Sequence, residues 1–129
     1  MGVTISANGS NISFDMGYGG FYNLRCAIAQ CVDSVFGRFY ESSYTTAEEF
    51  NRVIKKRNLT CDRVLAFLFM PDCEGSVDYK TCKDILGFIK DVDFGDRCFR
   101  YTAYAHNDYE EFKQFLAECV KYHRNMRWG

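Results

Sequence analysis

Met70-Pro71-Asp72-Cys73-Glu74-Gly75-Ser76-Val77-Asp78 is the stretch that divides the helical pattern of this chain, and it contains the only proline. Pro71 fixes its own φ and disfavours helical geometry at the residue before it, so a helix that enters the stretch must end by Phe69. Gly75 can take a positive φ, and Asp78 can cap the next helix. The stretch therefore predicts a sharp reversal between helices at residues 62–69 and 78–90.

The same stretch could instead bind an ion, because its spaced acids and glycine partly follow the order of an EF-hand calcium loop. With Gly75 in the glycine position, Met70 occupies the first ligand position and Thr81 the last, where a bidentate glutamate is expected. A structural turn is therefore favoured, and no residue is assigned to a metal. Cys73 lies between two acids that should raise its thiol pKa, which argues against a nucleophile. The candidate binding residues here are Asp72, Cys73, Glu74, Gly75 and Asp78.

Three segments of the chain resemble a set of small, uncharacterised bacterial and phage proteins. Asp72-Cys73-Glu74-Gly75 is similar to their Ser-Asp-Cys-(Asp/Glu)-Gly loop, with Pro71 in the place of the serine. The stretch 18–25 resembles the opening of their first helix, and Met126-Arg127-Trp128 resembles their short apolar end. The resemblance implies a link to phage or mobile elements but no particular activity.

Apolar periodicity predicts an α+β fold in a single domain, residues 1–129. Alternating segments at 3–7 and 11–16 flank Asn8-Gly9, a strong hairpin signal, with Ile5, Ile12, Phe14 and Met16 on the buried face. Apolar residues recur every three or four positions in the helices. We expect four to five amphipathic helices, including a long central one. The predicted helices are 21–40, 46–57, 62–69, 78–90 and 107–123, with irregular structure at 98–104 and a short edge strand at 126–128.

A glycine-rich connection precedes the central helix and offers a second candidate site. Backbone amides at a helix start can bind an anion, and Arg25 lies one turn further on. The spacing matches neither a P-loop nor a dinucleotide-binding motif, so a plain strand-to-helix connection is favoured. The candidate residues are Tyr18, Gly19, Gly20 and Arg25.

Composition excludes several classes of function. A net charge of −1 gives no basis for general nucleic-acid binding. The longest apolar run, residues 64–70, is far shorter than a membrane span, and no secretion signal is present, so we expect a cytoplasmic protein without membrane contact. The seven cysteines include no Cys-x-x-Cys pair and are expected to be reduced thiols.

The inventory of reactive groups does not favour an enzyme and implies no cofactor. His106 and His123 are the only histidines, and neither has a second ligand at metal spacing. Twelve Phe, nine Tyr and one Trp are an aromatic excess, and many of the tyrosines fall near loops or helix ends, where such rings can form a binding surface. We therefore expect a non-catalytic accessory protein that binds another macromolecule, namely another protein. The alternative is a small-ligand or anion binder at the glycine-rich connection.

Overall fold

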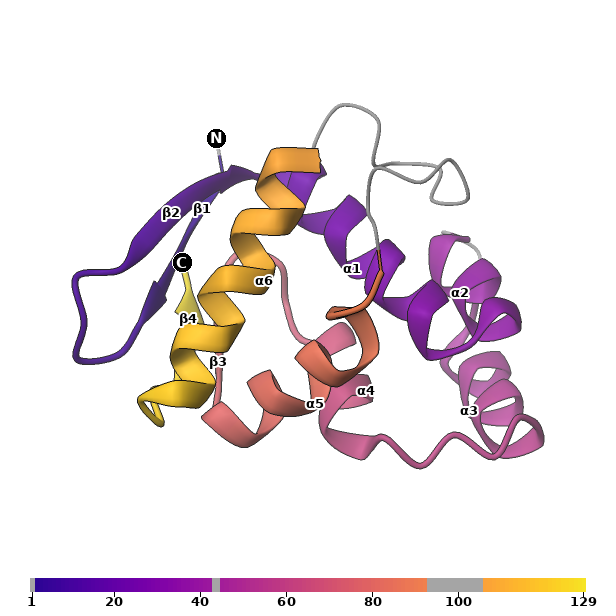
Figure 1. Ribbon diagram of the computed structural model, residues 1–129. Coiled ribbons are helices and arrows are strands. Elements are labelled where there is room, and N and C mark those ends of the chain that lie inside the picture. Colours follow the sequence, from indigo (N-terminus) through magenta and orange to yellow (C-terminus); the bar gives the residue numbers. More distant parts are fainter. Residues whose placement is uncertain (1, 43–44, 93–105) are drawn as a thin grey trace.

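The computed structural model describes residues 2–42, 45–92 and 106–129, which form an α+β arrangement (Figure 1). The strands are β1 (Gly2–Ala7), β2 (Ser13–Gly17), β3 (Gly75–Val77) and β4 (Met126–Trp128). The helices are α1 (Tyr18–Val32), α2 (Ser34–Glu41), α3 (Ala47–Lys56), α4 (Asp62–Leu68), α5 (Tyr79–Ile89) and α6 (His106–Lys121). The predicted fold class is confirmed, although the described residues contain six helices instead of four to five. The predicted irregular segment 98–104 lies outside the described residues.

The N-terminal hairpin forms around Asn8-Gly9, as its sequence predicts. Gly9 has a φ of 76°, a left-handed conformation that glycine adopts without steric cost. The two strands are antiparallel, with Ile5 opposite Phe14. The prediction that Ile12 shares the buried face is wrong, because Ile12 lies in the connection before β2 and is 39% exposed.

The four-stranded sheet has the order β2-β1-β4-β3, and every neighbouring pair is antiparallel. The predicted strand at 126–128 is confirmed as β4, which pairs with β1 of the hairpin, but it lies inside the sheet between β1 and β3, so the predicted edge position is wrong. The sequence analysis does not predict the strand β3, which has only three residues. Segments from both ends and the middle of the chain thus meet in one sheet.

Gly75 has a different role from the predicted one. Among the described residues, Gly9 is the glycine with a positive φ, whereas Gly75 lies in β3 opposite Trp128. A Cβ atom on Gly75 would lie 2.1 Å from Cζ2 of the Trp128 ring. Glycine is therefore required because the indole packs directly against the backbone, and not because of its φ.

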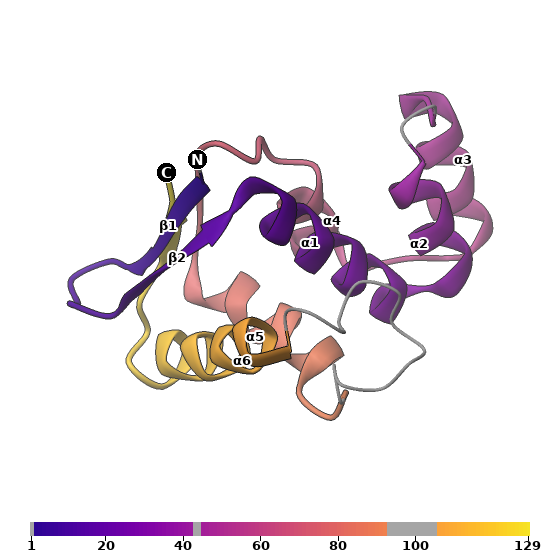
Figure 2. The same ribbon diagram turned by 90° about the horizontal axis from the view of Figure 1, so that it is seen from above.

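One face of the sheet is apolar and packs against α1 and α6. Phe21 of α1 lies 5.7 Å from the Trp128 ring, and Phe14 of β2 lies 5.6 Å from Phe115 of α6, both measured between ring centroids. Figure 2 shows the sheet at one end of the molecule, with the helices gathered beyond it. This face and the two helices form the main hydrophobic core.

A cluster of four aromatic rings attaches α2 and α3 to the end of α4. The rings belong to Phe36, Tyr40, Phe50 and Phe69, and all six centroid distances among them are between 4.9 and 6.4 Å. Four of these six ring pairs meet edge to face, and such contacts stabilise a structure beyond the burial of area alone. Phe36 is fully buried, whereas Phe69 is 47% exposed, so the cluster extends from the core to the surface.

The predicted helix 21–40 is two helices that meet at Asp33. This residue is extended, with φ −166° and ψ 132°, and its carboxylate accepts a hydrogen bond from the Phe36 backbone N–H at 2.9 Å. Asp33 therefore caps α2, as aspartate commonly does at a helix start. Gly37 allows α2 to turn back closely over α1, because a Cβ at residue 37 would lie 2.8 Å from the Cα of Gln30.

Replacing Asp33 with asparagine should weaken the pH dependence of stability in acid. Arg57 donates hydrogen bonds to the Asp33 carboxylate and lowers its pKa in the folded protein. The ion pair therefore stabilises the fold above about pH 4, the ordinary aspartate range, and this contribution is lost as pH falls through the lowered pKa. Urea unfolding between pH 7 and acid should show a smaller loss for D33N, which keeps the cap, than for the unaltered protein.

The matched control for this prediction is Asp84→Asn. Asp84 pairs with Arg63 at 3.6 Å, and both side chains are more than 40% exposed. Exposed pairs of this kind contribute little. D84N should follow the unaltered protein, and equal acid profiles for all three proteins would contradict the role of the Asp33 pair.

No helix among the described residues is long and apolar enough to cross a membrane. The six described cysteines are free thiols. Cys26, Cys82 and Cys119 are fully buried, as expected for small core residues, whereas Cys73 is exposed.

Candidate functional site

The stretch 70–78 is a structural connection with an exposed polar tip. Nε1 of Trp128 donates a hydrogen bond to the Pro71 carbonyl at 3.0 Å, which fixes the start of the connection. The Asp78 carboxylate accepts hydrogen bonds from the backbone N–H and the hydroxyl of Thr81, at 2.9 and 3.0 Å, and the predicted helix cap is confirmed. Between these anchors, Asp72, Cys73 and Glu74 are exposed.

The predicted candidate residues of this stretch are not gathered around a common point. Among the residues that the structure describes, no three His, Cys, Asp or Glu side chains lie close enough to hold a metal ion. Asp78 is engaged as a cap, and the hydrogen bond from the Thr81 backbone lowers its carboxyl pKa. Asp72, Cys73 and Glu74 are neighbours only because they follow one another in the chain.

The glycine-rich connection is mostly the first turn of α1. The helix begins at Tyr18 and not at Phe21, so Gly19 and Gly20 are helical, and Gly17 is an N-cap without a side-chain hydrogen bond. At this helix start the glycines can therefore offer an anion only their backbone N–H groups. The predicted contribution of Arg25 to an anion site depends on where its guanidinium lies.

Arg25 is 4% exposed and lies against the end of α4. Its Nη2 donates hydrogen bonds to the carbonyl oxygens of Phe67 at 2.9 Å, Leu68 at 2.5 Å and Met70 at 2.6 Å. Carbonyls at a helix C-terminus lack the usual N–H partner four residues further on, and positive charge is favourable there. Arg25 is therefore a cap for α4, and its Nη2 is engaged there, whereas the prediction places Arg25 beside an anion at the start of α1.

Aromatic side chains complete the surroundings of Arg25. Its guanidinium carbon lies 5.4 Å from the Phe21 ring centroid and 5.5 Å from that of Phe67, within the range of cation–π attraction. Tyr40 donates its hydroxyl to the Leu68 carbonyl at 2.6 Å. Burial raises the pKa of Tyr40 to about 12, so the phenol stays a protonated donor at neutral pH.

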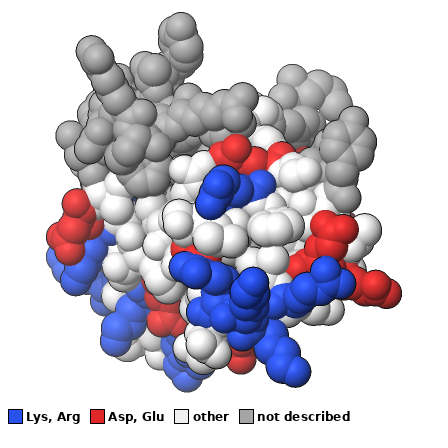
Figure 3. All heavy atoms as spheres, turned by 90° about the vertical axis from the view of Figure 1, so that its right-hand side faces the viewer, with Lys and Arg blue, Asp and Glu red and all other residues white. Residues whose placement is uncertain are grey.

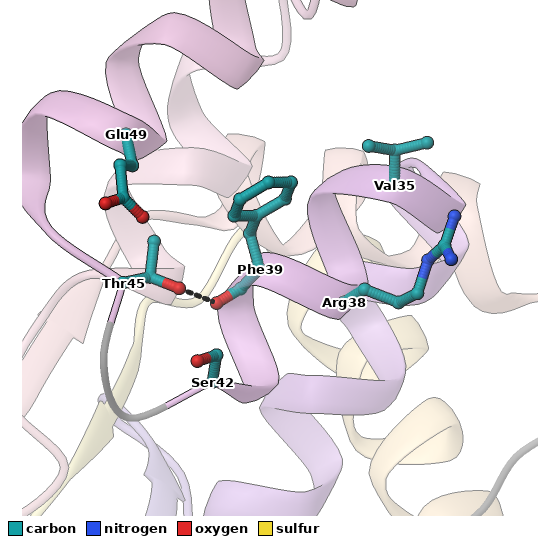
Figure 4. A pocket seen from close by; sticks show the side chains of 6 residues that line it. All are labelled: Val35, Arg38, Phe39, Ser42, Thr45 and Glu49. Carbon is teal, nitrogen blue, oxygen red and sulfur yellow. Dashed lines mark hydrogen bonds between the residues drawn. The ribbon is translucent and has the colours of Figure 1, made fainter.

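The structure contains a pocket between α2 and α3 that the sequence does not reveal (Figure 4). Its volume is about 600 Å³, and its lining residues are Val35, Arg38, Phe39, Ser42, Thr45 and Glu49. In Figure 4 the Phe39 ring points into the space between the helices, while Glu49 and Thr45 lie on the other side from Arg38. The Thr45 hydroxyl donates to the Phe39 carbonyl at 2.7 Å and ties the two walls together.

A second, smaller pocket of about 250 Å³ shares Val35 and Phe39 with the first. Its other lining residues are Arg52, Val53, Lys56 and Arg57. The lining positions of α2 and of α3 recur every three or four residues, so each helix presents one face to this space. We name the two pockets together the α2–α3 groove.

Positive charge borders the α2–α3 groove. Arg57 is occupied by Asp33 at 3.0 Å, but Arg38, Arg52 and Lys56 make no ion pair with any residue that the structure describes. Glu49 is the one acid among the lining residues given above. Figure 3 views the side that carries α2 and α3, and Lys and Arg side chains gather in the lower middle of this face. The groove thus has an apolar centre and a predominantly cationic rim.

No family model, curated protein or solved structure matches this chain. The chemistry of the α2–α3 groove is therefore derived from its own geometry.

Proposed function

We propose that this chain is a non-catalytic protein-binding module, and that the α2–α3 groove binds an acidic peptide segment of a partner protein. The observation that supports this function is the apolar pocket pair around Val35 and Phe39, with cations at its rim that form no ion pair with any described residue. An apolar side chain can fill such a pocket while carboxylates approach the rim, the usual division between the centre and the edge of an interface.

The kind of partner follows from the charges. Arg38 of α2 lies across the groove from Glu49 of α3, and Arg52 and Lys56 follow Glu49 along α3, with Val35 and Phe39 among the lining residues. A nucleic-acid backbone would meet this carboxylate, and the whole chain has a net charge of −1. A peptide that alternates apolar and acidic side chains matches the groove better.

The alternative of an anion at the start of α1 has weaker support, because Arg25 is engaged at α4. We also propose a relationship to the phage and bacterial proteins that the 72–75 loop resembles, and a reducing compartment such as the cytoplasm. The support for the first is the loop sequence, and for the second the free cysteines among the described residues.

Selection of a random peptide-display library against the full chain tests this function. We expect enrichment of peptides that combine Asp or Glu with a large apolar residue. A selected peptide should bind the double variant R52Q/K56Q about 5- to 10-fold more weakly, because two rim charges are lost, and the affinity should fall with added salt.

The control is the double variant K80Q/K83Q, which makes the same change in charge on α5. Lys80 and Lys83 are exposed and do not line the groove. This control should bind as the unaltered chain does. Enriched peptides without acids, or equal affinity for the two double variants, would contradict the proposed function.

A further inference from the structure

A second feature, outside the α2–α3 groove, is a pair of buried thiols between α5 and α6. Cys82 of α5 and Cys119 of α6 are both fully buried. The two thiols are hydrogen-bonded to each other. Neither contacts the groove, so they are unrelated to the proposed peptide binding.

The register of the two helices places these cysteines opposite each other. Figures 1 and 2 show α5 and α6 side by side and running in opposite directions. At one end of this pair the Tyr79 ring stacks on the His123 ring, with 4.4 Å between centroids and 9° between planes. Cys82 follows Tyr79 by three residues, about one turn of α5, and Cys119 lies in the last turn of α6, four residues before His123, which comes just after the helix end, so both thiols lie about the same distance along the chain from the stacked rings.

We infer that Cys82 and Cys119 are a redox-sensitive dithiol, which a low-molecular-weight disulfide such as oxidised glutathione converts into a disulfide joining α5 to α6. The geometry that supports this is the position of the two buried, hydrogen-bonded thiols opposite each other on packed, antiparallel helices, near the stacked Tyr79 and His123 rings. Among the described cysteines, Cys73 is exposed and Cys26 is buried beside Tyr22, so the other thiols lie in different surroundings.

The order of the two steps follows from the hydrogen bond. The Cys82 thiol donates to the Cys119 sulfur, which lowers the pKa of Cys119 and raises that of Cys82, and Arg124 adds favourable positive charge near Cys119. The Cys119 thiolate therefore attacks oxidised glutathione, forms a mixed disulfide and releases one glutathione thiolate. Cys82 loses its proton, attacks the Cys119 sulfur and releases the second glutathione, so two protein thiols are oxidised as one glutathione disulfide is reduced.

Because both thiols are buried, the test measures the redox equilibrium of the cysteine pair and not the rate at which the pair is oxidised. The reduced full chain is incubated in glutathione buffers of increasing oxidised fraction until the products no longer change, and free thiols are then blocked. Trypsin should release peptides 81–83 and 114–121, and mass spectrometry detects their covalent union. We expect the disulfide between Cys82 and Cys119 to form at a ratio of oxidised to reduced glutathione at least about tenfold lower than the ratio at which any other cysteine pair forms a disulfide.

Three cysteine variants test whether the joined peptides come from Cys82 and Cys119. C82A and C119A should each abolish the joined peptides, whereas C26A, which removes an equally buried cysteine, should leave them unchanged. Peptide mapping of the unaltered chain identifies the linkage even if a variant fails to fold. The inference is overturned if another pair of cysteines joins first, or if Cys82 and Cys119 remain free thiols in the most oxidising buffer.

Discussion

Replacing Arg25 with methionine is expected to lower the free energy of unfolding by about 3–5 kcal/mol, the largest effect of a single polar side chain in this fold. Methionine keeps much of the length and the apolar contacts with Phe21 and Phe67. It removes the donor to three carbonyls at the end of α4. The Leu68 carbonyl keeps the Tyr40 hydroxyl and the Phe67 carbonyl keeps the Met70 N–H, but all three carbonyls lose a hydrogen bond from a charged donor, and such bonds contribute about 1.5–3 kcal/mol each.

Urea unfolding of R25M at neutral pH measures this loss. The matched control is Arg38→Met, an exposed arginine of the neighbouring α2, which should change stability by no more than about 0.5 kcal/mol. Arg25→Lys should lie between R25M and the unaltered protein, since lysine keeps the charge but not the planar fork of the guanidinium. Equal stability of R25M and R38M would show that α4 does not depend on this cap.

Replacing Gly75 with alanine should cost about 3 kcal/mol, although it adds only a methyl group. The added Cβ would lie 2.1 to 2.7 Å from three atoms of the Trp128 ring. Trp128 is 3% exposed and is held by its hydrogen bond to the Pro71 carbonyl, so the ring cannot move aside without losing core contacts and that bond. The strain therefore falls on β3, β4 and the 70–78 connection together.

Gly87→Ala is the control, because the same chemical change is made where nothing lies within 4 Å of the new Cβ. Gly87 is an exposed position of α5, and alanine there should stabilise the protein by about 0.5–1 kcal/mol. Thermal unfolding followed by circular dichroism should thus shift in opposite directions for the two variants. A shift of the same sign for both would refute the close packing of Trp128 on Gly75.

The parts of the fold that could be predicted are those with a local signal. Asn8-Gly9 predicts its hairpin, and Thr46 and Asp78 predict helix starts, because each acts on residues within three or four positions. The apolar spacing of 21–40 continues through Asp33, since α2 buries its own apolar face after the break. Periodicity therefore predicts helix but not the change of direction, and Asp33-Ser34 is the one local sign of a new cap.

The features that could not be predicted depend on residues far apart in the chain. Arg25 meets carbonyls more than 40 residues away, and β3 is too short to be recognised without its partner β4. The α2–α3 groove arises because the break at Asp33 folds one short helix against the next. Candidate residues such as Asp72 and Glu74 stand out by their type, whereas Val35 and Phe39 resemble any other core residues until the groove is seen.

The position of β4 between β1 and β3 also has a consequence for synthesis on the ribosome. The hairpin of β1 and β2 emerges first, yet the inner edge of β1 receives its partner only after residues 126–128 have left the exit tunnel. Until then both β1 and β3 present unpaired backbone groups, and the indole that covers Gly75 is absent. Sheet closure therefore waits for residues 126–128, and until they emerge the nascent chain must keep two open edges from pairing with other molecules.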